Sequence, residues 1–351
     1  MKVLVTGGCG FLGSNLSSAF LAEDAEVVVL DALFREGSAS NLHWLTEQAD
    51  TKQFNFIQAD VSDNDAVQML FCNHAPFDYV CHVAGQVAMT SSLQDPRRDL
   101  ETNILGTFNI LEAIRKYSPN ALLAYSSTNK VYGDLDWIEL QELTTRYTAP
   151  GYPLGFDEEL PLDFSTPYGC SKGSADQYVR DWSRIFGLNT VVFRHSSIYG
   201  GRQFSTYDQG WVGWFCQKMI EQKYSIVQGL DMPVFTVSGC GKQVRDVLHA
   251  SDLVHLYKAA FMRREQCSGH IFNIGGGLDN SLSIRELLFL IQDNINLPEL
   301  SFSNISRRKS DQDFFVANIS KASEILGWIP KISSSSGIAS MLDWIYEIKR
   351  Q

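Results

Sequence analysis

The short stretch Tyr168-Gly-Cys-Ser171-Lys172-Gly173 holds residue types for two different kinds of chemistry. Gly169-Cys-Ser-Lys-Gly173 fits the pattern G-x-S-x-G, in which a serine on a strand-to-helix turn is the nucleophile of a hydrolase. Tyr168 and Lys172 fit the pattern Y-x-x-x-K, in which a tyrosine exchanges a proton with a substrate hydroxyl and the lysine stabilises its phenolate. The elements around the stretch decide between these interpretations.

The surrounding sequence favours the tyrosine and lysine pair. A nucleophile turn follows directly from an apolar strand, whereas Ser171 follows a polar segment, residues 162–168, that contains Pro167. Residues 171–185 have the pattern of a helix, on which side chains four residues apart share a face. Tyr168 and Lys172 are therefore expected to point the same way. A hydroxyl from residues 126–128, at the end of the preceding predicted strand, would share the proton and orient a substrate alcohol.

The N-terminal residues predict a dinucleotide-binding unit. The β-branched run at residues 2–6 ends in Gly7-Gly-Cys-Gly10-Phe-Leu-Gly13, and a helical pattern follows at 14–21. A second apolar run, residues 26–31, ends in Asp31. Glycines let the main chain approach a pyrophosphate, and an acid about 20 residues further on accepts from a ribose diol. Because an acid there repels a 2′-phosphate, the pattern favours NAD over NADP.

The same alternation continues through the N-terminal half. Further predicted strands are residues 54–59, 77–83 and 121–125, and residues 103–117 are a predicted helix. Alternating strands and helices predict an α/β fold, a doubly wound parallel sheet of the Rossmann type. Ligands of such sheets bind at the carboxyl ends of the strands. Asp31, Asp60, Ala84 and Ser126 are therefore expected along one rim.

Composition excludes several classes of partner. The formal net charge of −11 argues against a nucleic-acid or anionic-membrane surface, which requires clustered Lys and Arg. No apolar run approaches the roughly 20 residues of a membrane span. Seven cysteines without a C-x-x-C pair predict a reduced, cytoplasmic protein. The histidines are isolated, so no metal site is predicted.

Taken in order along the chain, the motifs resemble those of the extended short-chain dehydrogenases and reductases that act on nucleotide sugars. They are Thr6-Gly7-x-x-Gly10-Phe-Leu-Gly13, Asp60-Val61, His82-x-Ala84-Gly85, Asn103-x-x-Gly106, Ser126-Ser-Thr128-x-x-Val-Tyr-Gly133, Tyr168-x-x-x-Lys172, Arg245-Asp246-x-x-His249-x-x-Asp252, Asn273-Ile-Gly-Gly276 and Arg308-x-x-Asp311. The resemblance covers essentially all of the chain and implies an enzyme that uses NAD.

The resemblance also implies which residues form the site. The implied catalytic residues are Thr128, Tyr168 and Lys172. The implied NAD-binding residues are Gly7, Gly10, Phe11, Leu12, Gly13, Asp31, Asp60, Val61, Ala84, Gly85, Gln86, Asn103, Ser126, Tyr168, Lys172 and His195. The implied substrate-binding residues are Gln86, Thr128, Ser197, Arg202, Gln209, Val212, Arg245 and Arg308.

Within this class the chain most resembles the epimerases that invert C2 of a CDP-sugar, CDP-3,6-dideoxyglucose, by transient hydride transfer to NAD. The resemblance lies in stretches such as Asn41-Leu-His-Trp44 and Phe193-Arg-His-Ser-Ser197. Sugar 4,6-dehydratases of the class carry Asp-Glu directly after the threonine, because eliminating water needs a carboxylic acid and a carboxylate base. This chain has Asn129 and Lys130 there.

Two alternatives stay open at this point. One is a C4 epimerase, or a reductase, that acts on another NDP-sugar such as UDP-glucose. The other is a non-enzymatic NAD-binding regulator, although the intact Thr128, Tyr168 and Lys172 count against it. No residue distinguishes cytosine from uracil by its chemistry alone.

A smaller C-terminal α/β lobe is expected to hold the substrate. The expected NAD-binding domain comprises residues 1–198 and 243–276, with residues 243–262 returning to the main sheet, and the expected nucleotide-sugar lobe comprises residues 199–242 and 277–351. The resemblance implies a homodimer or homotetramer. Residues 134–167 form a long insertion that is either a lid or a surface excursion.

Six large side chains near the expected substrate site need a role. Arg194, Arg202, Arg245 and Arg308 are candidates for the phosphates of the nucleotide, since guanidinium groups pair well with phosphate oxygens. Trp211 and Trp214 are expected to lie in the core and not to form a platform for the base.

Overall fold

The computed structural model describes residues 1–49, 53–87, 89–308 and 310–350. Its main element is a sheet of seven parallel strands in the order β3-β2-β1-β4-β5-β8-β12. These strands are β1 (Lys2–Thr6), β2 (Glu26–Asp31), β3 (Phe54–Gln58), β4 (Tyr79–His82), β5 (Leu122–Thr128), β8 (Asn189–His195) and β12 (Ile271–Ile274). The predicted doubly wound α/β fold is confirmed.

Both faces of this sheet are covered by helices, because successive side chains of a strand point to opposite faces. In β1, Val3 and Val5 join one hydrophobic cluster and Leu4 joins the other. The first face carries α1 (Phe11–Leu21), α2 (Ser38–Gln48), α9 (Ala250–Met262) and α12 (Ser320–Leu326). The second carries α3 (Asn64–His74), α6 (Gly106–Tyr117) and α7 (Thr166–Phe186). Burial on both faces explains why the strands read as unbroken apolar runs.

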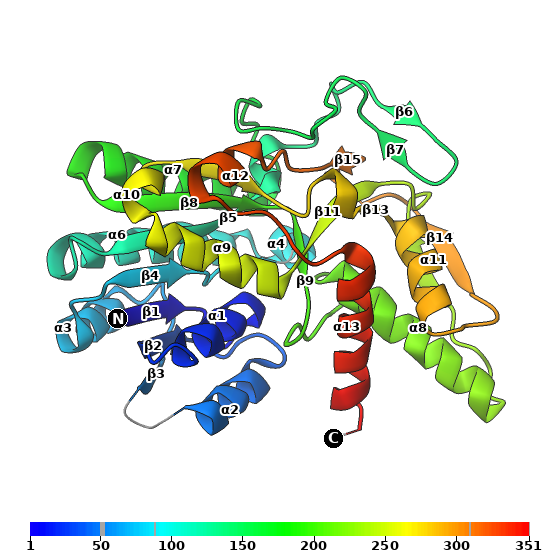
Figure 1. Cartoon of the computed structure of the whole chain (residues 1–351), viewed down its shortest axis with the longest axis horizontal. Helices are drawn as coiled ribbons and strands as arrows, with labels where there is room; N and C mark the ends of the chain where they lie inside the picture. Colours follow the sequence, from blue (N-terminus) through cyan, green and yellow to red (C-terminus); the bar gives the residue numbers. More distant parts are fainter. Residues whose placement is uncertain (50–52, 88, 309, 351) are drawn as a thin grey trace.

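A C-terminal lobe lies beside the main sheet, as Figure 1 shows. Its elements are α8 (Trp211–Gln228), β10 (Phe235–Ser238), α11 (Ile284–Asn294), β14 (Phe302–Ile305) and α13 (Ser334–Ile348). Strands β10 and β14 pair in parallel. Phe215, Leu287 and Met341, one from each helix, meet in the core of this lobe. A four-stranded sheet joins the lobe to the main unit. It consists of β9 (Ser197–Tyr199), β11 (Val244–His249), β13 (Ser281–Ser283) and β15 (Phe314–Phe315).

Residues 243–276 divide between the two units. Strand β11 pairs with β9, β13 and β15, whereas α9 packs on the main sheet and β12 forms its edge. The expectation that residues 243–262 return to the main sheet is therefore wrong for β11 and right for α9. A short apolar strand is compatible with either sheet, and the sequence does not name its pairing partner.

The remaining elements are short. They are α4 (Met89–Gln94), α5 (Pro96–Asp99), a π-helical turn (Leu100–Leu105) that continues into α6, a 3-10 turn (Asn129–Tyr132), β6 (Gln141–Glu142), β7 (Tyr147–Thr148), α10 (Arg264–Cys267) and a 3-10 turn (Leu278–Asn280). The β6–β7 hairpin is held on the C-terminal lobe, since Arg146 makes paired contacts of 2.8 and 2.5 Å to Glu286. Within the described ranges, no helix combines the length and apolar character that crossing a membrane requires.

A buried ion pair fastens α7 to the main sheet. Arg194 of β8 contacts Asp176 of α7 through two hydrogen bonds of 2.9 and 3.0 Å, and both side chains are almost fully buried. Ser127 donates to the same carboxylate at 2.7 Å, and Arg194 donates to the Tyr132 hydroxyl at 2.9 Å. The suggestion that Arg194 binds a phosphate is therefore wrong, because its donors are engaged inside the protein.

Replacing Asp176 by Asn should destabilise the fold strongly. The change keeps the shape but leaves the Arg194 charge buried without a counter-charge, which costs about 3–5 kcal/mol of unfolding free energy. Urea denaturation of the two proteins measures this difference.

The matched control is Asp181→Asn on the same helix. Asp181 pairs with Arg184 in solvent, with side chains that are 42% and 56% exposed, so the expected loss is below about 1 kcal/mol. Equal losses for the two variants would contradict the role assigned to the buried pair.

Candidate active site

Two adjoining cavities lie at the carboxyl ends of the main strands. The first, of about 470 Å³, is bounded by the turn after β1 and by the ends of β2 and β4. The second, of about 370 Å³, lies between the end of β5 and the C-terminal lobe. Ser126, Ser127 and Tyr168 line both, so the cavities meet at these residues. None of the described residues that line either cavity comes from the insertion at 134–167.

The glycine turn leaves room for a ligand to lie against its main chain. A Cβ on Gly13 would stand 2.0 Å from the Gly7 oxygen, and one on Gly7 would stand 2.8 Å from Ala84. A Cβ on Gly10 would meet, among the described atoms, only the Gly7 oxygen at 3.2 Å, and Gly10 lines the first cavity. Helix α1 begins directly after Gly10, and a helix leaves its first amides without intrahelical partners. The turn thus fits the diphosphate of a dinucleotide.

Asp31 closes the far side of this turn. Its carboxylate accepts from the Cys9 amide at 2.9 Å and the Leu33 amide at 2.7 Å, and it lines the first cavity. Burial raises the pKa of Asp31, while these amide hydrogen bonds lower it. An acid in this position fits a ribose diol and disfavours a 2′-phosphate.

Asp60, at the end of β3, is engaged by a cation that the sequence analysis missed. Arg98 donates to Asp60 at 2.9 Å, and its guanidinium lies 4.3 Å from the ring centre of Phe34. Arg98 and Phe34 both line the first cavity. They lie outside the recognised motifs. Phe34 comes from the loop after β2 and Arg98 from the short helix α5.

The structure brings nearly all of the predicted NAD-binding residues to the first cavity. The exceptions are Asn103 and His195, which are not among the described residues that line it. Asn103 holds the main chain of Gln86, which does line the cavity. Its side chain accepts from the Gln86 main-chain amide at 2.9 Å and donates to the Gln86 main-chain oxygen at 3.0 Å. His195 lines the second cavity, where its Nδ1 lies 3.1 Å from the Ser126 hydroxyl.

Tyr168, Lys172 and Thr128 meet at the junction of the two cavities. Tyr168 and Lys172 lie on one face of α7, only 9% and 3% exposed, and the Lys172 ammonium donates to the Ser126 oxygen at 2.5 Å. Burial raises the pKa of Tyr168 to about 12, although its hydrogen bond with Thr128 opposes this. Burial lowers the pKa of Lys172 to about 7, and the Asp176 charge opposes that shift. A phenol, an ammonium and a second hydroxyl together suit proton exchange with a substrate alcohol.

Ser171 is not placed as a nucleophile. It lies within α7, not on a turn after a strand, and is 3% exposed. Its hydroxyl donates to the Tyr168 main-chain oxygen at 2.9 Å and accepts from the Asn103 side-chain amide at 2.9 Å. The hydrolase interpretation of the opening stretch is therefore wrong.

The predicted substrate residues do not all gather in one place. Those that line the second cavity are Thr128, Ser197, Gln209, Arg245 and Arg308. Gln86 and Arg202 line the first cavity, where Arg202 stacks 4.0 Å from the centre of the Trp44 ring. Val212 is 2% exposed in the core of the C-terminal lobe and is not among the described residues of either cavity, so the prediction that it touches substrate is wrong.

Helix α8 turns its tryptophans, not Val212, toward the second cavity. Trp211 and Trp214 line it while also packing on the core of the C-terminal lobe, and Trp211 donates to the Ser197 hydroxyl at 3.0 Å. The expectation that both are core residues is thus right only in part. The periodicity of α8 was readable from the sequence, but its rotation about its axis was not.

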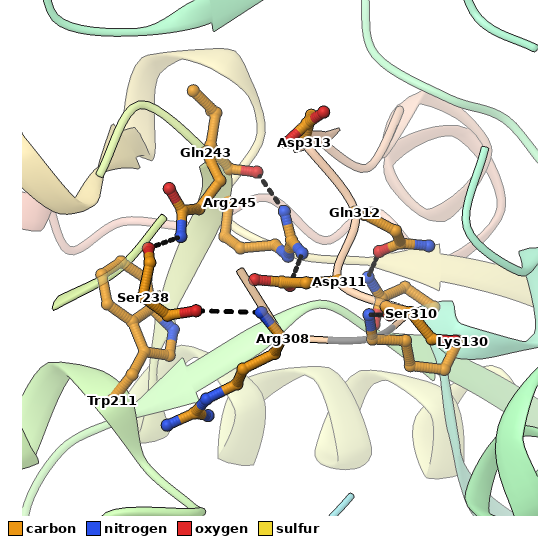
Figure 2. A network of polar contacts seen from close by, with 12 residues as sticks. Lys130, Trp211, Ser238, Gln243, Arg245, Arg308, Ser310, Asp311, Gln312 and Asp313 are labelled. Atoms are coloured by element: carbon orange, nitrogen blue, oxygen red, sulfur yellow. Dashed lines mark hydrogen bonds and ion pairs between the residues drawn. The ribbon is translucent and has the colours of Figure 1, made fainter. Parts of the chain in front are cut away.

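Two arginines, Arg245 and Arg308, line the second cavity. Figure 2 shows them on opposite sides of Asp311. Arg245 donates to the Asp311 carboxylate at 2.9 Å and to the Val244 main-chain oxygen at 2.7 Å. Arg308 donates to the Tyr207 oxygen at 3.1 Å and lies 4.7 Å from the centre of that ring. Within the described ranges, no cluster of three or more His, Cys, Asp or Glu residues is arranged to hold a metal ion.

Comparison with known proteins identifies the family. The model of the GDP-mannose 4,6 dehydratase family matches residues 4–341. The chain belongs to this family.

This member of the GDP-mannose 4,6 dehydratase family is similar to epimerases and to dehydratases. It is 52% identical to the CDP-paratose 2-epimerase of Salmonella typhi, over 99% of this chain and 100% of that protein. It is 30% identical to the dTDP-glucose 4,6-dehydratase of Salmonella typhimurium, over 98% and 92%. The solved UDP-glucose 4-epimerase of Thermus thermophilus, in complex with NAD, is 28% identical, with a TM-score of 0.79 over 99% of both chains. The resemblance to nucleotide-sugar epimerases is confirmed, and the chain is an enzyme of that class.

Gly10→Ala should separate cofactor binding from folding. The φ of Gly10 is −72°, which alanine adopts readily, and the new methyl group would project into the first cavity. We expect the protein to fold with only a small loss of stability, since the new Cβ would stand 3.2 Å from the Gly7 oxygen. We expect its NAD affinity to be at least about tenfold lower, equivalent to about 1.4 kcal/mol. Calorimetric titration with NAD measures this.

The control is Gly151→Ala, where a Cβ would meet none of the described atoms within 4 Å. It should leave NAD affinity unchanged. Unaltered NAD binding by Gly10→Ala would place the cofactor elsewhere.

Proposed function

We propose that this protein is an NAD-dependent epimerase that inverts C2 of CDP-3,6-dideoxyglucose (CDP-paratose) to give CDP-tyvelose. The observation that carries the proposal is the 52% identity to a CDP-paratose 2-epimerase over the full length of that protein. The cavity beside the glycine turn and Asp31 fits NAD. Bound NAD would supply the acceptor for the C2 hydride and the donor that returns it, and would leave each cycle unchanged.

The chain's own residues handle the proton of the reacting hydroxyl. Tyr168, as phenolate, takes the proton from the C2 hydroxyl as the hydride leaves, and gives it back when the hydride returns. Lys172 stabilises the phenolate by its charge, and Ser126 holds that ammonium in place. Burial raises the pKa of Tyr168, whereas Thr128 lowers it and orients the substrate oxygen. Such acid-base groups contribute typically about 10²–10⁴ in rate.

The second cavity is the proposed site of the nucleotide sugar. Arg245 and Arg308 are cations that face it, and they suit the two phosphates. Trp211 and Trp214 offer aromatic surface for the base. In this proposal residues 1–198, together with α9 and β12, form the unit that holds NAD. Residues 199–242 and 277–351, together with β11 and its Arg245, hold the substrate. We also propose that the protein is cytoplasmic, as its cysteine usage favours. The resemblance further suggests a homodimer or homotetramer that serves lipopolysaccharide O-antigen synthesis.

A C4 epimerase of UDP-glucose is the second candidate. It is favoured by the structural similarity to UDP-glucose 4-epimerases such as the one from Thermus thermophilus. The same phenol, ammonium and hydroxyl would serve at C4, since the chemistry at the two carbons is alike.

Proton NMR of CDP-paratose incubated with the protein in heavy water decides between these candidates. We expect the gluco signals to give way to manno signals without deuterium at C2, because hydride returns internally. Deuterium at C2 would contradict hydride transfer and indicate carbanion chemistry. If CDP-paratose is unchanged while UDP-glucose gives UDP-galactose, the C4 candidate replaces the proposal.

Tyr168→Phe should abolish turnover while NAD stays bound. The phenylalanine keeps the ring but has no proton to exchange, so kcat should fall at least about 10³-fold. Turnover assays and the NAD content of the purified variant measure the two effects.

Ser171→Ala is the matched control, one turn away on the same helix. It removes contacts to Asn103, to the Tyr168 main-chain oxygen and to Asp99, none of which involves the Tyr168 phenol, so kcat should change less than about tenfold. An inactive Ser171→Ala beside an active Tyr168→Phe would overturn the assignment.

A further inference from the structure

Asn129 and Lys130 lie in the turn that follows Thr128, residues 129–132, which we call the catalytic turn. Their side chains contact a segment far along the chain. The two residues directly follow Thr128 and begin the 3-10 turn at the end of β5. Lys130 donates to the Ser310 oxygen at 2.9 Å, and Asn129 donates to Gln312 at 2.8 Å. Figure 2 shows Lys130 beside Ser310 and Gln312, next to Asp311. The two contacts thus bridge residues 129–130 and 310–312.

Gln312 is held at both ends of its amide. Its oxygen accepts from Asn129, and its nitrogen donates to the Gly133 oxygen at 2.7 Å. The side chain is fully buried. If either partner were lost, a polar atom of the amide would have no hydrogen-bond partner and no access to water. This arrangement fixes Gln312 to the catalytic turn and leaves little freedom to slide.

The bridged segment, residues 310–312, adjoins the charges that face the second cavity. Arg308 lies two residues before Ser310, and Asp311 accepts from Arg245 at 2.9 Å. Ser310 itself has a φ of +55°, a left-handed conformation that is costly for a residue other than glycine. Surrounding contacts must therefore hold the segment, and the Lys130 contact to Ser310 is one of them.

We propose that Asn129 and Lys130 are positioning residues. They hold residues 310–312, and with them the proposed phosphate-binding Arg308 and the Arg245–Asp311 pair, at a set distance from Thr128 and Tyr168. We call the two contacts, Lys130 to Ser310 and Asn129 to Gln312, the clasp. The inference rests on the proposed function, since it assumes a nucleotide sugar anchored by Arg245 and Arg308. In this role the clasp determines which sugar carbon reaches Tyr168.

Arg245 and Arg308 form the proposed anchor for the diphosphate, and epimerisation requires this anchor to stay in place. The sugar has to present both faces of one carbon to the same acid-base group while its diphosphate stays bound. A shift of the anchor by about 1 Å would move the reacting carbon away from Tyr168, and misplacement of that size can cost about 10²-fold in rate. The clasp prevents this shift because it ties residues 310–312 to the turn that follows Thr128. Arg308 lies just before these residues, and Arg245 is paired with Asp311 among them.

The test compares Lys130→Met and Asn129→Ala with the unaltered protein. We expect kcat for CDP-paratose to fall about 10- to 100-fold in each variant. The dissociation constant of CDP, measured by calorimetry, should change less than about threefold, because Arg245 and Arg308 keep their own contacts. Lys130→Arg retains a donor for the Ser310 oxygen and should restore kcat to within about threefold of the unaltered protein.

Ser165→Ala is the matched control. Its hydroxyl lies 3.2 Å from the Ser310 hydroxyl, so the change removes a contact to the same residue without touching the catalytic turn. It should leave both kcat and CDP affinity unchanged. Thermal unfolding of all variants accounts for any general loss of stability.

The outcomes separate the clasp from the proposed function. Normal kcat in Lys130→Met and Asn129→Ala, in a protein that epimerises CDP-paratose, would overturn the clasp alone. A tenfold loss of CDP affinity in Lys130→Met would also overturn it, because the ammonium would then contact the diphosphate directly. An unaltered protein that binds CDP but turns over neither CDP-paratose nor UDP-glucose would overturn the proposed function, and the clasp with it.

Discussion

The whole site depends on one contact of a buried cation: the Lys172 ammonium donates to the Ser126 main-chain oxygen at 2.5 Å. The same ammonium lies 4.3 Å from the centre of the Tyr125 ring. The contact with Ser126 fixes α7, which carries Tyr168, against the end of β5, which carries Thr128. One turn further along α7, Asp176 binds Arg194 and Ser127. The same helix thus holds the reacting pair and fastens it to two neighbouring strands. Because desolvation disfavours both a phenolate and an ammonium, the charged pair needs further stabilisation, which an oxidised nicotinamide would provide.

The order of elements follows from this constraint. In a parallel sheet the carboxyl ends of all strands meet at one edge, so the glycine turn, Asp31 and the end of β5 fall along one line. The cofactor cavity occupies one part of that edge and the second cavity the next. Strand β11 leaves the main sheet and joins the C-terminal lobe, which lets Arg245 face the second cavity from the lobe. The proposed catalytic residues and the proposed substrate anchor therefore come from different units that share one boundary.

Local signals in the sequence predicted the main sheet well and the second cavity poorly. The runs at β1 and β2 have the residue types, length and flanking glycines that define a βαβ unit, so both strands were placed correctly. Arg194 was misjudged because its partner Asp176 lies on another element, and no local pattern announces a buried pair. Val212 was misjudged because the rotation of α8 depends on packing against Leu287 and Met341. Arg98 and Phe34 were missed because they meet between a short helix, α5, and the loop after β2, which no local pattern announces.

The pair Asn129 and Lys130 shows how a change at the active site is matched elsewhere in the chain. Their partners in the clasp are acceptors, the Ser310 main-chain oxygen and the Gln312 side-chain oxygen. Carboxylates at positions 129 and 130 would set negative charge against these oxygens, with Asp311 close by, and would repel them. The segment at 310–312 is therefore complementary to an amide and an ammonium, and not to the Asp-Glu pair of the dehydratases. In the proposed role, Asn129 and Lys130 stand where the dehydratases carry their acid and base, and the same two residues hold the substrate anchor in place.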